Sequence, residues 1–201
     1  MAVPGAVPSW QPPPSRVDRA AEDAALTHVR ADRRGEALQL LMAAYGDPVT
    51  AFAVRILRDR ELARDVRQQV FLEAFQGISR FEGRSSLWTW LCGIAYHRCL
   101  DELRRNRRAA ALDDFDVLDG LVGQPDPTMD LDQVAKQRGL EACLGKLSPA
   151  LRSQLLMRYL LGLSYVEIGE MVGVAPGTVQ VRMSRILPRL RRCLRGEGLA
   201  R

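Results

Sequence analysis

The spacing of apolar residues predicts helices through most of the chain, in two separate segments. Within residues 34–109, apolar side chains recur at every third or fourth position, as in Val66, Val70 and Phe71, which is the period of an amphipathic helix. The same spacing resumes at about residue 134. We therefore predict an all-α protein with two small helical domains, at residues 34–109 and 134–201.

Local capping signals predict where some of these helices begin. Asp47-Pro48 has the form of an N-cap followed by the first residue of a helix, because aspartate accepts backbone N–H bonds and proline needs no donor there. Ser85 or Ser86 is a suitable N-cap for a long helix that extends to about Arg108. The segment before this helix is predicted to be a loop.

Two segments differ in composition from the helical ones. Residues 1–33 start with the proline-rich string MAVPGAVPSWQPPPS, which predicts a disordered N-terminal extension. Residues 110–133 hold seven aspartates and no basic residue, and Pro125 and Pro127 interrupt any long helix there. We interpret this second segment as an acidic, flexible linker between the two domains.

Residues 164–186 have the pattern of a helix-turn-helix. Gly169 in the first helix is small enough for close approach of a crossing helix, and Gly173 suits a turn that requires positive φ. Pro176 suits the first position of a second helix, where its missing N–H costs nothing. The apolar face of the first helix consists of Ile168, Met171 and Val172.

The second helix of this motif carries an apolar stripe and, on another side, a polar and basic stripe. A basic face on such a helix suits phosphates and base edges in the major groove of DNA. We therefore predict that this helix binds DNA. The apolar stripe is Val179, Met183, Ile186 and Leu190, and the polar stripe is Thr178, Arg182, Arg185 and Arg189.

The long helix after Ser86 carries a second candidate site. Its polar side combines Trp90 with charged residues, and such a face can stack a nucleic-acid base while arginines hold phosphates. The alternative is that Trp90 covers a neighbouring helix while Arg98, Glu102 and Arg105 form pairs within their own helix. Spacing alone leaves both interpretations open. The polar side contains Trp90, His97, Asp101, Arg104 and Arg108.

The charge of the chain favours a polyanionic partner. The 201 residues carry a formal net charge of +5. No stretch approaches the roughly 20 apolar residues of a membrane span, and the N-terminus lacks the order of a signal peptide. We therefore expect a cytoplasmic protein with no membrane insertion.

We expect neither a metal site nor enzymatic activity. Cys92, Cys99, Cys143 and Cys193 have no CxxC spacing, and His97 is turned away from the two nearest cysteines on a helix. Buried or incidental thiols are the expected state, with redox sensing left as an alternative. The chain has no glycine-rich phosphate loop and no paired carboxylates on a pocket-forming motif. We expect no cofactor and no small-molecule substrate.

The order of several short motifs resembles the extracytoplasmic-function (ECF) class of bacterial sigma-70 factors. The resemblance covers most of the chain, and the lack of any sigma-3 domain fits this class. The residues that look like a sigma-2 domain are 62–71, 80–81, 86–91, 94–95 and 101–105, and the segment that looks like a sigma-4 domain is 163–192.

In the first domain, the resemblance implies contacts with core RNA polymerase and with the −10 element of promoter DNA. A helix would dock on the polymerase, while the loop and the long helix would engage and melt the −10 element. The core-binding residues would be Asp65, Gln68 and Phe71. The −10 residues would be Arg80, Phe81, Trp88, Trp90, His97, Asp101, Arg104 and Arg105.

In the second domain, the resemblance implies a recognition helix that reads the −35 element. Its contact residues would be Thr178, Gln180, Arg182, Arg185 and Arg189, of which Arg182 and Arg185 would reach base edges. The acidic linker would thread toward the active-site cleft of the polymerase. An anti-sigma factor would hold the protein inactive.

Several positions depart from the residues usual in this family. Arg64 and Gln69 stand where acidic residues are usual, which weakens the expected contact with core polymerase. His97 replaces a common asparagine and Gln180 a common lysine. Pro188 should kink or end the recognition helix.

An autonomous helix-turn-helix regulator is the alternative function. Such a protein would bind an operator without core polymerase, and its N-terminal domain would sense a signal or dimerise. The sigma-2-like motifs between residues 62 and 105 argue against it.

Overall fold

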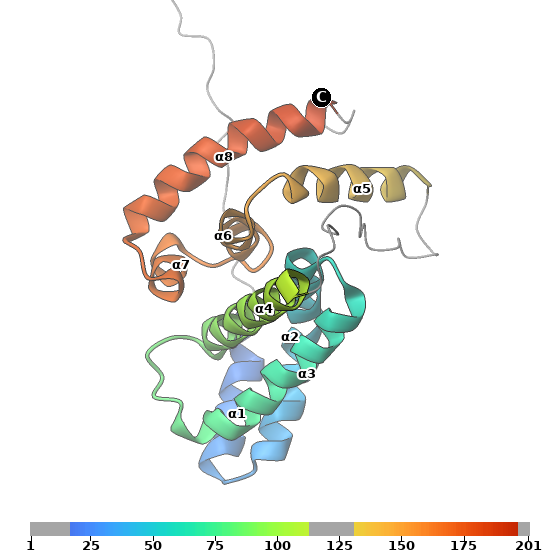
Figure 1. The fold of residues 1–201 in the computed structure, drawn as a ribbon. Helices are drawn as coiled ribbons and strands as arrows, with labels where there is room; N and C mark the ends of the chain where they lie inside the picture. Colours follow the sequence, from blue (N-terminus) through green and yellow to red (C-terminus); the bar gives the residue numbers. More distant parts are fainter. Residues whose placement is uncertain (1–16, 113–130, 197–201) are drawn as a thin grey trace, which may run out of the picture.

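The computed structural model describes residues 17–112 and 131–196, and these ranges contain helices and no β-strand (Figure 1). The predicted all-α fold is confirmed. Helices α1 to α4 form one bundle, and α5 to α8 form a second group next to α4 (Figure 1). The helices are α1 (Arg19–Arg30), α2 (Arg34–Leu57), α3 (Arg60–Gly77), the short 3-10 helix η1 (Ile78–Arg80), α4 (Leu87–Leu112), α5 (Leu131–Gly145), α6 (Pro149–Tyr159), α7 (Tyr165–Val172) and α8 (Pro176–Gly196).

Helix α1 packs against α2, so the predicted disorder of residues 1–33 is wrong for residues 17–33. Asp18 caps α1 by accepting the N–H of Ala21, at 3.0 Å, and Ala25 is fully buried. Residues 1–16, which carry the proline-rich string, lie outside the described residues. The first bundle consequently begins before residue 34.

A buried carboxylate ties α1 to the start of α4. Glu22 accepts the N–H groups of Leu87, at 3.2 Å, and of Trp88, at 2.7 Å. Its Oε1 also accepts the hydroxyl of Tyr45, at 3.0 Å. The first N–H groups of a helix have no partner within the helix, so external acceptors satisfy them. Ser86 accepts a further N–H of this turn, at 3.0 Å, which confirms its predicted role as N-cap.

Helix α2 runs without interruption, so the helix start predicted at Asp47-Pro48 is wrong. A proline inside a helix removes one backbone hydrogen bond and costs about 3 kcal/mol. Tyr45 and Val49, on either side of Pro48, are each 1% exposed. Burial of their side chains in the bundle offsets the cost of the proline and keeps the helix whole.

Helix α2 is long and apolar enough to cross a membrane, judged by length and composition alone. A core helix meets the same criterion. Eight residues of α2 are buried, and the helix packs against α1, α3 and α4. We therefore interpret α2 as the central helix of the first bundle.

The helix-turn-helix forms as the sequence predicts. Ser164 and Glu167 make a reciprocal capping box at the start of α7. Gly173 ends α7 with φ of 69°, in the left-handed region. A Cβ atom on Gly169 would lie 2.7 Å from the carbonyl oxygen of Val174. Only glycine therefore allows the turn before α8 to pack this closely on α7.

Helices extend beyond the limits that the sequence predicted for them. Helix α4 reaches Leu112 and α5 begins at Leu131, so both ends of the predicted linker at 110–133 are helical. The remainder of that segment, residues 113–130, lies outside the described residues. Helix α8 continues through Pro188, so this proline does not end the recognition helix.

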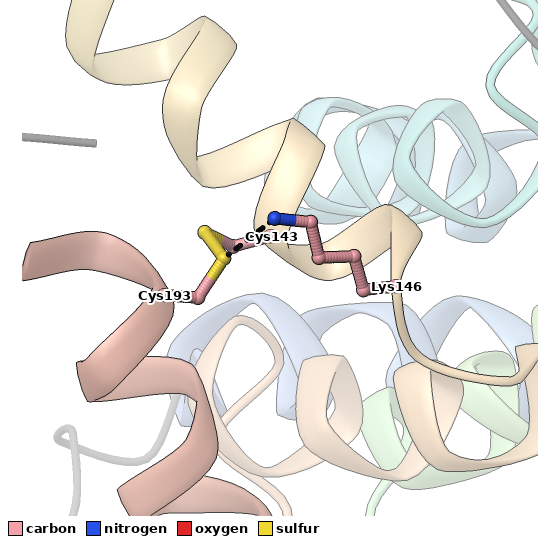
Figure 2. The surroundings of a disulfide bond; sticks show 3 residues. All are labelled: Cys143, Lys146 and Cys193. Carbon is pink, nitrogen blue, oxygen red and sulfur yellow. Dashed lines mark hydrogen bonds between the residues drawn. A yellow bond between two sulfur atoms is a disulfide. The ribbon is translucent and has the colours of Figure 1, made fainter. Parts of the chain in front are cut away.

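A disulfide within the second group of helices corrects the expectation of four incidental thiols. Cys143 of α5 is bonded to Cys193 of α8, with their Cα atoms 5.9 Å apart (Figure 2). The Lys146 ammonium donates to the Cys193 sulfur, at 3.4 Å (Figure 2). Cys92 and Cys99 are free and buried. Burial raises the pKa of Cys99 to about 12 and the pKa of Cys92 well above that of an ordinary thiol, so both stay neutral.

Removal of this disulfide should destabilise the second group of helices. The bonded cysteines are 50 residues apart in sequence, and such a bond contributes about 2–4 kcal/mol, chiefly by restricting the unfolded chain. We expect Cys193→Ser to lower the midpoint of urea unfolding, and dithiothreitol to lower the midpoint of the natural protein to the same value. The reductant should leave the variant unchanged. An equal shift in both proteins would contradict the assignment.

A buried guanidinium joins the two groups of helices. Arg152 of α6 donates to the carbonyl oxygens of Leu144, at 3.0 Å, and Gly145, at 3.3 Å, near the end of α5. It also donates to the carbonyl of Ile56, at 3.5 Å, near the end of α2. Carbonyls in the last turn of a helix lack partners within the helix. Burial, and to a smaller extent the nearby Arg58, lowers the pKa of Arg152.

Candidate nucleic-acid interface

A groove of about 370 Å³ lies between the first bundle and helix α7, along the polar side of α4. We call it the α4 groove. It brings together residues from the helix-turn-helix and residues that the sequence assigns to the −10 site. Its lining residues are Glu73, Ser85, Thr89, Trp90, Gly93, Ile94, His97, Glu167, Glu170 and Met171.

Trp90 is half-buried in the wall of the α4 groove. Its ring centroid lies 5.5 Å from that of Phe81, and a Cβ atom on Gly77 would lie 3.2 Å from the indole. The tryptophan therefore covers the end of α3, as one of the two sequence interpretations requires. It also lines the groove, as the other requires, so the two interpretations are compatible.

Charged side chains beside the groove are largely paired. Arg98 donates to Glu73, at 2.6 Å, and so links α4 to α3. Within α4, Arg104 and Arg105 each donate to the acidic residue three positions earlier, at 3.3 and 2.5 Å. The predicted intrahelical pair of Arg105 is confirmed, whereas Arg98 pairs mainly between helices. The pair of Arg104 with Asp101 is exposed and contributes little free energy, so Arg104 can exchange this carboxylate for a phosphate at low cost. Glu102 is buried, so Arg105 cannot leave it at the same low cost.

Two hydrogen bonds hold the helix-turn-helix against α4. The Thr89 hydroxyl donates to Oε1 of Glu167 in α7, at 2.5 Å. The Trp88 indole N–H donates to the carbonyl of Leu161, just before α7, at 3.0 Å. Because Trp88 is only 1% exposed, water does not compete for this second bond. In this arrangement α7 forms one side of the α4 groove, next to Thr89 and Trp90.

The side of the α4 groove formed by α7 is acidic. Glu167 and Glu170 both line the groove, together with His97 of α4. Burial raises the pKa of Glu167, but hydrogen bonds from Ser164 and Thr89 outweigh this effect and hold the pKa below its ordinary value. Ionised carboxylates repel the phosphates of a nucleic acid. These two carboxylates therefore disfavour a nucleic acid in the groove in this arrangement.

The residues predicted to contact the −10 element differ in accessibility. Trp88 lies in the core and is not accessible to DNA in this arrangement, so its assignment as a contact residue stays a prediction. Phe81 and Trp90 are half-buried. The exposed residues of the set are Arg80, His97, Asp101, Arg104 and Arg105.

The exposed side of α3 differs from the predicted polymerase-binding set. Asp65 and Gln68 are exposed, but Phe71 is 3% exposed and belongs to the core, so it is not available to a partner. Leu72 and Phe75 are 57% and 37% exposed. They continue the side of Asp65 and Gln68 at helical spacing. Neither residue belongs to the predicted set. Their helical spacing from Asp65 in the sequence would have placed them on the same side of α3.

Helix α8 presents six arginines and no acidic residue. Arg182 is half-buried and donates from Nη1 to Oε1 of Gln154 in α6, at 3.2 Å, so it lies at the edge of the exposed face. Val181, which is 48% exposed, was not among the predicted contact residues. The other predicted contact residues are exposed: Thr178, Gln180, Arg185 and Arg189. The buried stripe includes Val179, Met183 and Ile186, as predicted.

Comparison with known protein families gives one match in each group of helices. Residues 41–109 match the family described as Sigma-70 region 2. Residues 137–190 match the family described as Sigma-70, region 4. The first range includes α3 and most of α4, and the second includes the helix-turn-helix.

The chain is similar in sequence to several bacterial proteins over most of its length. It is 30% identical over 166 residues to the RNA polymerase sigma-H factor of Pseudomonas aeruginosa, covering 78% of this chain and 84% of that protein. It is 33% identical over 181 residues to the probable RNA polymerase sigma-C factor of Mycobacterium bovis, covering 83% and 89%. It is 27% identical to the ECF RNA polymerase sigma factor SigW of Bacillus subtilis, covering 75% and 85%.

Solved structures of two complexes contain a similar fold. One is the sigma factor RpoE in complex with the anti-sigma factor NepR from Bartonella quintana, with a TM-score of 0.67 and 25% identity, covering 78% of this chain and 95% of that chain. The other is CnrH in complex with the cytosolic domain of CnrY, with a TM-score of 0.63 and 23% identity, covering 88% and 98%. The second likeness concerns the fold alone.

Proposed function

Because the chain belongs to the sigma-70 family, in the extracytoplasmic-function class of RNA polymerase sigma factors, we propose that it directs core polymerase to promoters through two DNA-binding surfaces. One surface is the exposed side of α8 and the other is the α4 groove. The observation that carries the proposal is the pairing of an arginine-rich helix-turn-helix with an aromatic groove in one chain.

The exposed side of α8 reads the −35 element in this proposal. A helix with six arginines and no acidic residue complements the phosphates that border the major groove. Arg185 and Arg189 are exposed and free to reach base edges or phosphates. Arg182 lies at the edge of this face because of its bond to Gln154, so we assign it to the margin of the site.

The α4 groove receives the −10 element after α7 has moved away. Trp90, held by Phe81 and the end of α3, offers a ring against which an unpaired base can stack. Holding a base outside the duplex lowers the cost of strand separation. Arg104 binds an adjacent phosphate by exchanging its exposed partner Asp101 for it, whereas Arg105 contacts a phosphate while it stays paired with the buried Glu102.

Docking on core polymerase uses the exposed side of α3. Asp65 and Gln68 supply polar contacts, and Leu72 and Phe75 supply apolar area that is otherwise exposed to water. Apolar residues that stay exposed beside polar ones on a single helix face are typical of a protein interface.

The arrangement of α4 and α7 is a closed form that must open before promoter binding. The −10 and −35 elements lie about 25 base pairs apart, which is about 85 Å along the duplex. Two surfaces joined by the bonds of Thr89 and Trp88 cannot reach both elements at once. The 18 residues between α4 and α5 can extend to about 60 Å, and the 21 residues of α8 add about 30 Å along their own axis, so the chain allows the separation.

We further propose that an anti-sigma factor controls this opening, as the partner in the RpoE complex implies. The protein acts in the cytoplasm, where core polymerase is, and has no catalytic activity of its own. The described part of the chain contains no cluster of three or more side chains that could hold a metal ion, and the proposed function requires no cofactor.

Run-off transcription with bacterial core polymerase tests the proposed function. A pool of random promoter fragments is transcribed with and without this protein. Discrete transcripts that require both proteins support a sigma factor and identify its −10 and −35 sequences together. Specific DNA binding by the protein alone, with no transcripts, would favour an autonomous regulator instead.

Replacement of Trp90 by alanine should impair promoter melting more than initial promoter binding. Stacking on an aromatic ring contributes about 1–3 kcal/mol per base, so we expect open complexes to fall about tenfold. Permanganate reactivity of unpaired thymines measures melting, and a gel shift at low temperature measures initial binding. Ser85→Ala, which alters the same groove without removing a ring, is the control. Equal losses in both assays would assign Trp90 to structural packing alone.

A further inference from the structure

The centre of the exposed side of α8 is an apolar residue rather than an arginine. Helical residues follow one another at about 100°, so the position two residues after the buried Val179 lies almost directly opposite the core. That position is Val181, and its side chain is 48% exposed. In Figure 1, α8 lies on the side of the molecule away from α1, α2 and α3, so the first bundle does not cover this face.

Exposed Thr178 and Arg185 flank Val181 one turn away on either side, but the residues closest to it on this face offer little to a ligand. The Ser184 hydroxyl on the same face donates to the Val181 carbonyl oxygen, at 2.8 Å, so its hydrogen is turned back onto the helix. Gly177, one turn earlier, has no side chain. A Cβ atom there would meet nothing within 4 Å, so packing within the chain does not explain this glycine. Its absence of a side chain lets a partner approach the backbone beside Val181.

The partner that fits this face is double-stranded DNA. Helix α8 carries six arginines and no acidic residue, so it complements the phosphates of DNA. A protein partner that buried the Val181 side chain would also have to remove water from these arginine charges, which costs free energy. The apolar group that bases present in the major groove is the C5-methyl of thymine. We propose that Val181 packs against a thymine methyl in the −35 element, and that this contact lets the protein recognise thymine at that position. This inference rests on the proposed function as a sigma factor.

The position of Arg185 predicts where this thymine lies. Arg185 is one helical turn beyond Val181, about 6 Å along the helix axis, and exposed arginines of a recognition helix commonly bind guanine. Base pairs are stacked about 3.4 Å apart. The thymine read by Val181 should therefore lie one or two base pairs from a guanine read by Arg185.

Uracil substitution tests the proposal, because deoxyuridine lacks only the methyl group. The −35 sequence is first obtained with the natural protein and core polymerase, and each thymine in it is then replaced singly by deoxyuridine. We expect one position at which binding of the natural holoenzyme falls about fourfold, the effect of one buried methyl group. Val181→Ala should lose a similar factor on thymine and should no longer respond to uracil at that position.

Two controls distinguish a methyl contact from a general disturbance of this face of α8. Ser184→Ala changes the same exposed face and should keep the response to uracil, and thermal unfolding should show that both variants are folded. A Val181→Ala holoenzyme that keeps the full response to uracil would overturn the proposal, as would a natural holoenzyme that responds at no thymine. Failure of the proposed function would be seen separately, as the absence of any core-dependent transcript.

Discussion

Thr89→Val should open the protein and raise its affinity for single-stranded −10 DNA about tenfold. Valine keeps the shape of threonine but removes the hydroxyl that donates to Glu167 across the closed interface. A hydrogen bond to a charged group contributes about 1.5–3 kcal/mol, and its loss shifts the equilibrium toward the form with an uncovered α4 groove. Fluorescence anisotropy with a labelled oligonucleotide measures the affinity, and small-angle X-ray scattering measures the expansion.

Thr89→Ser is the matched control for this experiment, because serine keeps the hydroxyl. It should leave the affinity and the radius of gyration near those of the natural protein. A gain in affinity without expansion would mean that Thr89 acts on DNA directly. No change in either quantity for Thr89→Val would contradict a closed form held by this bond.

The same contact should depend on pH. Hydrogen bonds from Ser164 within the α7 cap, and one from Thr89 of α4, hold the pKa of Glu167 below its ordinary value in the folded protein. Only the Thr89 bond joins α7 to α4, so through this bond the ionised form stabilises the closed arrangement above the ordinary pKa of glutamate, about 4.3. This stabilisation should be lost as the pH falls through the lower pKa of the folded state. We expect the natural protein to expand in that acidic range. Thr89→Val should show a smaller change, since part of the cause of the lowered pKa is gone.

Glu22→Ala should lower the free energy of unfolding by about 3 kcal/mol or more. The Glu22 carboxylate accepts two backbone N–H groups at the start of α4 and the hydroxyl of Tyr45. Alanine would leave the two backbone N–H groups without this acceptor and the Tyr45 hydroxyl with only the Asp18 carbonyl, at 3.5 Å. Each buried polar group left without a partner costs about 1–3 kcal/mol. Urea unfolding followed by circular dichroism measures the loss.

Asp23→Ala is the control for Glu22→Ala. It removes the same charge from the neighbouring, exposed position of α1. We expect a change of less than about 0.5 kcal/mol, as is usual for surface substitutions. Equal effects of the two variants would show that the charge of α1, rather than the buried hydrogen bonds, stabilises the bundle.

Several features that depend on residues close together in the chain were predicted correctly, although the helix start at Asp47-Pro48 was not. The N-cap at Ser86 bonds a residue three positions later, and the turn at Gly173 depends on the conformational freedom of one residue. The buried stripe of α8 follows from helical spacing alone. The predictions failed for α1 and for the pairing of Cys143 with Cys193. In both cases the stabilising partner lies far away in sequence: Glu22 bonds residues 65 and 66 positions later, and the cysteines are 50 residues apart.

The sequence by itself determined the helical class, the helix-turn-helix with its basic second helix, and the family. These features follow from caps, turns and helical period, which depend on residues within one or two turns of each other. Only the tertiary structure decided which side of each helix faces a partner. Phe71 and Trp88 are buried by neighbouring helices, Leu72 and Val181 are left exposed, and α7 forms one side of the α4 groove. These outcomes depend on how helices from distant parts of the chain pack together, which helical periodicity cannot specify.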